Sequence, residues 1–240
     1  MRVTILGVDL AWGPRNADGV FALRLNNGRV REAASFLTKG DEELMELVSR
    51  FSRESSRTLL AIDAPIVCPN STGSRPVDRL THVHFGKFHA GCYPANLTKC
   101  PRPAAIMKEL QGHGYVADWV TRHSTRLAVE VYPHTAMVRW FRLDRILKYK
   151  KGVVAEKRKE FLRLQSLFRK FLSRNHPGLQ RFASVRKLLE EPWSKPVEDR
   201  TDALACAVIG LQHWLSKGAN SEVLGNREDG FLVIPKSAYE

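Results

Sequence analysis

The amino-acid sequence predicts an α/β protein built on a mixed sheet, and three observations lead to this fold class. Three strand-like segments open the chain, strand-like and helical segments alternate after them, and the last long segment, residues 199–215, has strong helical periodicity. The 240 residues are 43% hydrophobic, which is enough for a substantial core. We therefore expect a single domain spanning residues 1–240.

The first quarter of the chain is expected to form three antiparallel strands, a helix and a fourth strand. An Asn27-Gly28 pair between the second and third strands suits a tight hairpin turn. Over residues 42–53, apolar residues recur at three- and four-residue spacing behind Asp41, a candidate helix cap. The four expected strands cover residues 3–11, 19–25, 29–36 and 58–62.

The middle and end of the chain contain two expected insertions. Residues 67–104, rich in Pro, Gly, Cys and His, are expected to be irregular apart from a short helix around 77–85. Residues 139–190 are expected to form a basic helical insertion. The remaining expected elements are helices over 104–111, 156–173, 184–189 and 199–215, a strand over 126–132, and a terminal hairpin from 222–224 and 230–235.

Targeting and membrane signals are not expected in this chain. The first strand is not preceded by a basic and apolar signal pattern, and no apolar run approaches the ~20 residues that cross a bilayer. We expect a soluble, cytoplasmic protein without membrane contact, and the sequence identifies no protein partner.

Acidic residues stand at four places where the surrounding residues predict burial. Asp9, Asp63 and Glu130 interrupt short aliphatic runs, and Asp202 lies on the last helix, three residues after Asp199. A buried carboxylate costs several kcal/mol unless it is paired, and hard divalent cations take oxygen ligands. We predict that Asp9, Asp63, Glu130 and Asp202 are catalytic and that they hold Mg²⁺ or Mn²⁺ together with Asp199.

Each of these acids also has a structural interpretation. Asp9 could bind backbone amides at a strand end, and Asp63 could form a turn before Pro65. Asp199 suits a helix cap as well as a metal ligand. Glu130 could pair with one of three arginines, namely Arg75, Arg79 and Arg126.

Positive charge is concentrated in one segment. The formal net charge is +13, and residues 139–187 contain 16 Lys or Arg against three acids, whereas the rest of the chain carries 22 of each sign. A concentrated basic surface favours a polyanion, with nucleic acid first, although a solvated helical face is the simpler alternative. The predicted substrate-binding residues are Arg75, Arg79, His134, Lys157, Arg158, Lys159 and Arg163.

The irregular insertion contains a second group of residues that could bind metal. A close pair, His89 and Cys92, has a spacing seen in structural zinc sites, but the chain has no Cys-x-x-Cys pair. Ordinary reduced cysteines are the favoured interpretation, and the sequence leaves zinc undecided. The full set is Cys68, His82, His84, His89, Cys92 and Cys100.

The motifs around the acids resemble those of a family of predicted ribonuclease H-like nucleases of largely unassigned role. The motifs are Gly-Val-Asp-Leu-Ala-Trp at 7–12, Ala-Ile-Asp-Ala-Pro-Ile at 61–66, Glu-Val-Tyr-Pro-His at 130–134 and Asp-Arg-Thr-Asp-Ala-Leu-Ala-Cys-Ala at 199–207. The last is also similar to the C-terminal helix of Holliday-junction resolvases, in which acids complete a metal site. The resemblance implies a ligand set of Asp9, Asp63 or Glu130, and Asp202 with Asp199. It also implies a ribonuclease H-like fold with a mixed five-stranded sheet flanked by helices.

These observations predict a metal-dependent nuclease. Glycine-rich phosphate loops, dinucleotide fingerprints and nucleophile-elbow motifs are absent from the sequence. In the expected mechanism, two Mg²⁺ or Mn²⁺ ions about 3.5 to 4 Å apart activate water and stabilise the leaving oxygen. The alternatives are a nucleic-acid-binding protein without turnover and an ATP-dependent phosphotransferase of the actin-like superclass.

Overall fold

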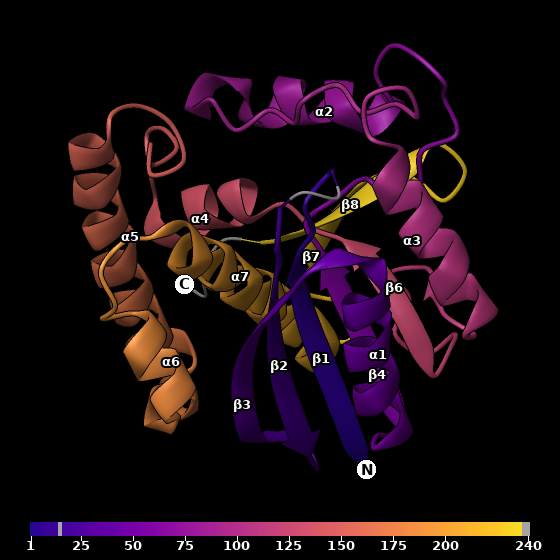
Figure 1. Ribbon diagram of the computed structural model, residues 1–240, viewed down its shortest axis with the longest axis horizontal. Helices are drawn as coiled ribbons and strands as arrows, with labels where there is room; N and C mark the ends of the chain where they lie inside the picture. Colours follow the sequence, from indigo (N-terminus) through magenta and orange to yellow (C-terminus); the bar gives the residue numbers. More distant parts are fainter. Residues whose placement is uncertain (14–15, 237–240) are drawn as a thin grey trace.

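The protein is described by a computed structural model that covers residues 1–13 and 16–236, with a mixed sheet at its centre (Figure 1). In the described residues this sheet has six strands in the order β3-β2-β1-β4-β6-β5. The strands are β1 (Arg2–Asp9), β2 (Asp18–Asn26), β3 (Arg29–Thr38), β4 (Arg57–Ile62), β5 (Val116–Ala117) and β6 (Arg126–Glu130). β2 is antiparallel to both of its neighbours, β1 and β3, whereas β4, β5 and β6 run parallel to β1. The predicted mixed α/β architecture is confirmed.

The strand count is the main correction to the predicted sheet. Five strands were expected, and the sixth is β5 at the edge, which contains only two residues. A segment this short cannot show the alternation of apolar and polar residues by which a strand is recognised. The expected C-terminal hairpin is present as β7 (Ser221–Asn226) and β8 (Gly230–Pro235).

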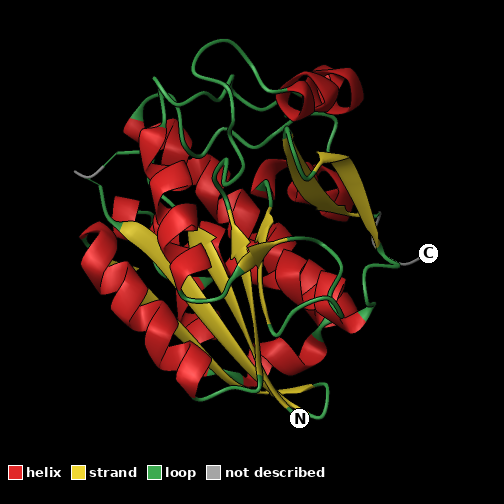
Figure 2. Cartoon of the chain, turned by 90° about the vertical axis from the view of Figure 1, so that its right-hand side faces the viewer, coloured by secondary structure: helices red, strands yellow, loops and turns green. Residues whose placement is uncertain are grey.

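The helices cover both faces of the sheet (Figure 2). On one face, α1 and α3 pack against β1 and β4; on the other, α4 to α7 form the larger core. The helices are α1 (Gly40–Arg53), α2 (Pro76–Phe85), α3 (Pro101–Gly112), α4 (Pro133–Phe141), α5 (Val154–Asn175), α6 (Ala183–Leu188) and α7 (Lys195–Leu215). Short 3₁₀ turns are η1 (Gly86–Phe88) and η2 (Pro177–Arg181).

Two helices differ most from the prediction, α4 and α7. The sequence did not predict α4, because the apolar run before it continues as far as Tyr132 and resembles a longer strand. Proline is well tolerated in the first turn of a helix, and Pro133 opens α4 in that way. α7 begins at Lys195, four residues before the expected start. Asp199 therefore lies beyond the first turn of α7 and does not cap it.

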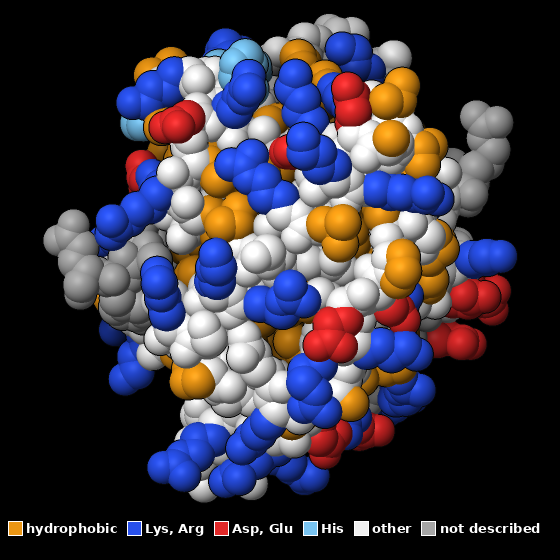
Figure 3. Space-filling model, turned by 90° about the vertical axis from the view of Figure 1, so that its left-hand side faces the viewer, with side chains coloured by type: hydrophobic (Ala, Val, Ile, Leu, Met, Phe, Trp, Pro, Cys, Tyr) orange, Lys and Arg blue, Asp and Glu red, His pale blue; other side chains and the backbone are white. Residues whose placement is uncertain are grey.

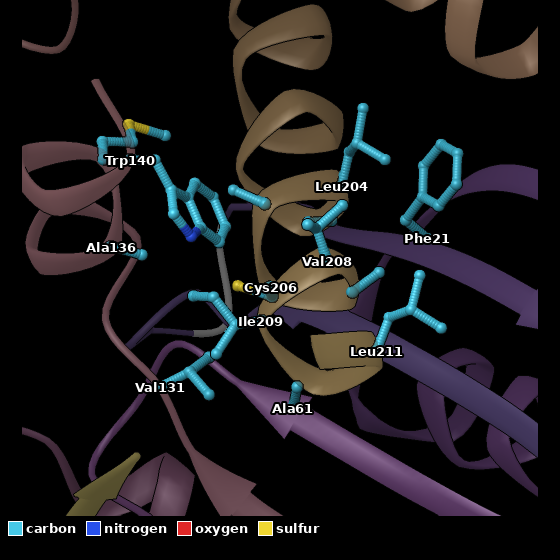
Figure 4. Packing of buried hydrophobic residues seen from close by; sticks show 14 of the residues in the cluster. Phe21, Ala61, Val131, Ala136, Trp140, Leu204, Cys206, Val208, Ile209 and Leu211 are labelled. Carbon is cyan, nitrogen blue, oxygen red and sulfur yellow. The ribbon is translucent and has the colours of Figure 1, made fainter. Parts of the chain in front are cut away.

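α7 lies directly on the sheet because two glycines of the sheet remove the side chains that would separate them. A Cβ atom added to Gly7 would lie 2.1 Å from the backbone oxygen of Ala203, and one added to Gly19 would lie 2.2 Å from that of Asp199. Figure 4 shows apolar side chains of α7, among them Leu204, Val208 and Leu211, beside Phe21 and Ala61 of the sheet. The close approach brings the first turns of α7, with Asp199 and Asp202, to the end of β1 at which Asp9 is found.

None of the helices in the described residues has the length and apolar composition that a membrane crossing requires.

Candidate active site

The candidate site lies at the carboxyl-terminal edge of the two central parallel strands. Asp9 is the last residue of β1, and Asp63 follows β4 directly. The backbone N–H of Asp63 donates to the carbonyl oxygen of Val8 at 2.8 Å, so the two acids follow strands held in register. Ligands gather at such strand ends in α/β sheets.

Both acids line a cleft of about 780 Å³. Its walls come from the segment after β1, the irregular insertion, the start of α4 and the loop between α4 and α5 (residues 142–153). Aromatic and basic side chains line the cleft beside the acids, namely Trp12, Tyr93, Tyr132, His134, Arg145, Lys148, Lys150 and Lys151. A cleft of this size is in the usual range for small-ligand sites.

Asp9 and Asp63 differ from the neighbouring acids in lacking a protein partner. Within the described residues, neither carboxylate makes a side-chain hydrogen bond or an ion pair that meets ordinary distance criteria. Burial raises the pKa of Asp9 well above its usual value, and the charges of Asp202 and Asp63 add to the effect, while Lys150 opposes it. Burial likewise raises the pKa of Asp63, to about 7, again against the effect of Lys150. These two half-buried carboxylates are therefore the groups most in need of a cation.

Asp202 lies on α7 and is fully buried. Its Oδ1 accepts a hydrogen bond from the Tyr149 hydroxyl at 2.7 Å, and its Oδ2 lies 2.6 Å from Lys150 Nζ. Although burial of Lys150 works in the opposite direction, Asp202 and Asp9 hold the pKa of this lysine well above its usual value. Sequence reasoning included Lys150 only in the general basic segment and missed Tyr149, because nothing in their local pattern indicates a contact with a helix about 50 residues away.

Glu130, at the end of β6, is bound by Arg75. The guanidinium donates from Nη1 to Oε2 at 2.8 Å and from Nη2 to Oε1 at 2.7 Å, and Nη2 also contacts Asp78 at 2.8 Å. Asp78 in turn accepts hydrogen bonds from the backbone N–H groups of Arg75 and Ala95. This buried network ties the irregular insertion to the sheet, and α2 lies across the carboxyl-terminal edge (Figure 1). It is the arginine pairing that the sequence had offered as the structural interpretation of Glu130.

The other predicted residues are spread around the cleft. Asp199 pairs with Lys195, whose Nζ lies 2.6 Å from its Oδ1. Arg79 is exposed and donates to the backbone oxygen of Ser74, on the outer side of α2. His134 lines the cleft beside the ring of Tyr132, 5.4 Å between ring centroids. Burial and the positive charge of Lys150 lower the pKa of His134 to about 4, so its imidazole is neutral at pH 7.

The basic segment covers the side of the molecule formed by α5 and α6. The space-filling view of this side shows many Lys and Arg side chains (Figure 3). Arg158, Lys159 and Arg163 are exposed on α5, whereas Lys157 packs over the ring of Trp193, 5.0 Å from its centroid. A second cleft of about 570 Å³ is lined by Lys159 and Arg163 and shares several residues with the first, including Arg145 and Lys148. The two clefts meet at these shared residues, and their basic side chains form a path from α5 to the acids that is interspersed with Asp144, Glu156 and Glu160.

The cysteine and histidine set of the insertion does not assemble into a metal centre. Cys68 and Cys100 are buried, and the His82 ring contacts the backbone oxygen of Cys92 at 2.8 Å. Over the residues that the structure covers, no three His, Cys, Asp or Glu side chains are arranged to hold an ion. This holds for the five acids as well, since Glu130, Asp199 and Asp202 are each occupied by a cationic side chain.

The fold and the site define an α/β protein in which two neighbouring carboxylates, Asp9 and Asp63, line a cleft together with basic side chains. The chain belongs to the family described as protein of unknown function DUF429, whose model matches residues 7–228. Neither the curated proteins nor the solved structures contain a significant match to the chain.

Proposed function

We propose that this protein is a metal-dependent nuclease that hydrolyses phosphodiester bonds of nucleic acid, with Asp9 and Asp63 as ligands of Mg²⁺ or Mn²⁺. One observation carries the proposal. Two half-buried carboxylates without a protein partner lie side by side at strand ends, in a cleft whose other charged side chains are basic apart from Glu156. Two unpaired carboxylates at such close quarters disfavour each other's ionised form, and a hard divalent cation removes this penalty.

The donor set fits the chemistry of such an ion. Carboxylate oxygens are the ligands that Mg²⁺ and Mn²⁺ prefer, and burial raises the pKa of both acids although the charge of Lys150 opposes the effect, so a bound cation would favour their ionised form. A bound ion of this kind supplies Lewis-acid activation of water and neutralises charge on a phosphate.

The remaining lining residues suit a nucleic acid strand. Arg145, Lys148 and Lys151 can neutralise phosphates at the cleft, and the basic path along α5 extends this surface. Exposed aromatic rings at the cleft, Trp12 and Tyr93, are of the kind on which bases stack. His134 is neutral at pH 7 and can therefore exchange hydrogen bonds with a bound strand without adding charge, while its pKa of about 4 disfavours its protonation there.

A cleavage assay tests the proposal. Single- and double-stranded DNA and RNA, hybrids and four-way junctions are incubated with the protein in Mn²⁺ or in EDTA. We expect Mn²⁺-dependent cleavage of at least one substrate, which Asp9→Asn abolishes and Asp144→Asn, at an exposed acid of the basic segment, leaves unchanged. Binding without cleavage of any substrate would overturn the proposal in favour of a non-catalytic nucleic-acid-binding protein.

A further inference from the structure

Lys150 and Tyr149 are consecutive residues that together occupy Asp202. Tyr149 is fully buried, with its ring 6.1 Å from that of Phe161 on α5 and its hydroxyl on Asp202 Oδ1. This anchor fixes the backbone from which Lys150 extends, and the lysine ammonium lies on the second oxygen of the same carboxylate. Oδ1 of Asp202 thus accepts a hydrogen bond, whereas the buried Oδ2 accepts none and is neutralised only by the charge of the Lys150 ammonium beside it.

The Lys150 ammonium also acts on the two free carboxylates. Of the neighbouring charges, that of Lys150 lowers the pKa of Asp9 and of Asp63 the most. Each of these acids in turn raises the pKa of the lysine. Lys150 therefore belongs to the same electrostatic group as Asp9, Asp63 and Asp202. Three ionised carboxylates and one ammonium leave two negative charges, which a single divalent ion neutralises.

Among the described residues, the acids beside Asp9 and Asp63 at the strand ends and on α7 already have cationic partners, and the one further acid that lines the cleft, Glu156, is exposed on α5. Arg75 binds Glu130 bidentately, and Lys195 binds both Asp199 and Glu198. A second divalent ion would need at least one of these pairs to break, and breaking a buried pair leaves an uncompensated charge.

We propose that Lys150 serves as a fixed cation in place of a second metal ion, so that the site binds one divalent ion through Asp9 and Asp63 while Lys150 neutralises Asp202. The inference rests on the proposed metal-dependent function, but it replaces the two ions expected from the sequence by one ion and one lysine. Lys150 is a positioning residue for Asp202, since it acts on the ion through the charge of the neighbouring carboxylates.

The test is the number of Mn²⁺ ions bound per chain, measured without substrate by calorimetric titration and by electron paramagnetic resonance of free Mn²⁺. Wild-type protein is expected to bind one ion. Lys150→Met removes the ammonium and keeps the apolar stem, so it is expected to bind a second ion, or to bind one ion roughly tenfold more tightly because a nearby positive charge has gone. Lys150→Arg restores the charge and is expected to return to the wild-type value.

Lys148→Met is the matched control, because Lys148 lines the same cleft but makes no ion pair with Asp202 in the described structure. It is expected to bind one ion with little change in affinity. Two ions bound by the wild type, or the same number and affinity in Lys150→Met, would overturn the inference. If Lys150→Met does not fold, Lys150→Gln makes the same change of charge and is read in the same way.

The outcomes separate this inference from the proposed function. Wild-type protein that binds two ions and cleaves nucleic acid would refute the role of Lys150 alone. Protein that binds no Mn²⁺ and cleaves nothing would refute both.

Discussion

Acids at two places on the same edge of the sheet differ in whether a protein side chain neutralises them. At the end of β6, Glu130 is held by two hydrogen bonds from Arg75, which also binds Asp78. At the ends of β1 and β4, Asp9 and Asp63 face a cleft, and burial raises the pKa of each. A buried carboxylate that binds a cationic side chain in this way stabilises the fold. Two neighbouring carboxylates without such partners favour the binding of a cationic ligand.

The largest expected effect is on catalysis, when one of the two acids without a protein partner is replaced. Asp9→Asn removes the charge of one proposed ligand at almost constant size, and loss of metal assistance costs several kcal/mol of transition-state stabilisation. We expect cleavage to fall by about 10³-fold or more, measured as initial rates in Mn²⁺. The melting temperature should not fall, because the substitution relieves repulsion among buried acids. Undiminished cleavage by Asp9→Asn would make Asp9 a structural acid.

Substitution of Glu130, which Arg75 binds, should lower the stability of the fold and not only the activity. Glu130→Gln leaves the buried Arg75 with only Asp78 as a charged partner, and breaking a buried pair costs about 3 kcal/mol or more. For a protein of this size the melting temperature should fall by roughly 6 to 12 °C, measured by calorimetry or circular dichroism. Glu222→Gln, which disrupts the more exposed pair with Arg139, is the control and should change stability by less than ~1 kcal/mol. Equal effects of the two substitutions would remove the distinction.

The basic face should affect binding strength without a large effect on the metal site. Replacing Lys157, Arg158, Lys159 and Arg163 by Gln should weaken nucleic acid binding across unrelated sequences. Each lost phosphate contact should flatten the slope of log K against log salt by roughly 0.9 for duplex DNA. The measurement is fluorescence anisotropy over a series of salt concentrations. Unchanged affinity at every salt concentration would show that these side chains form a solvated face.

The smallest expected effect tests how much the ionised form of Asp63 destabilises the fold, since burial, and then the charges of Asp202 and Glu130, raise the pKa of this carboxyl. Its pKa of about 7 lies above the ordinary value for an aspartate, so the folded state binds this proton more tightly than the unfolded state. The carboxylate therefore costs nothing at low pH, and it destabilises the fold increasingly as the pH rises from about 4 to about 7. In EDTA, Asp63→Asn should melt a few degrees above the wild type at pH 8 and at the same temperature at pH 4. A gain of equal size at both pH values would contradict this origin.

The sequence predicted the fold better than it predicted the pairing within the site. The order of the main strands and helices along the chain, the terminal hairpin and α7 follow from local periodicity, whereas α4 and the two-residue β5 give too little pattern to be distinguished. The acids were identifiable because ionisable residues interrupted apolar runs. Of their partners, Arg75 was one of three candidates for Glu130 and Lys150 was not identified, because long side chains reach the acids across 55 and 52 residues of sequence. Such contacts depend on tertiary geometry.

The central claim is that Asp9 and Asp63 bind a divalent cation while Glu130 serves the fold, and the change in melting temperature caused by Mn²⁺ tests it directly. A ligand at 100 times its dissociation constant stabilises the folded state by about 2.7 kcal/mol. We therefore expect Mn²⁺ to raise the melting temperature of the wild type and of Glu130→Gln by roughly 5 to 10 °C at pH 8, and not to raise that of Asp9→Asn. No shift in the wild type, or a full shift in Asp9→Asn, would contradict the assignment of these acids as the metal site.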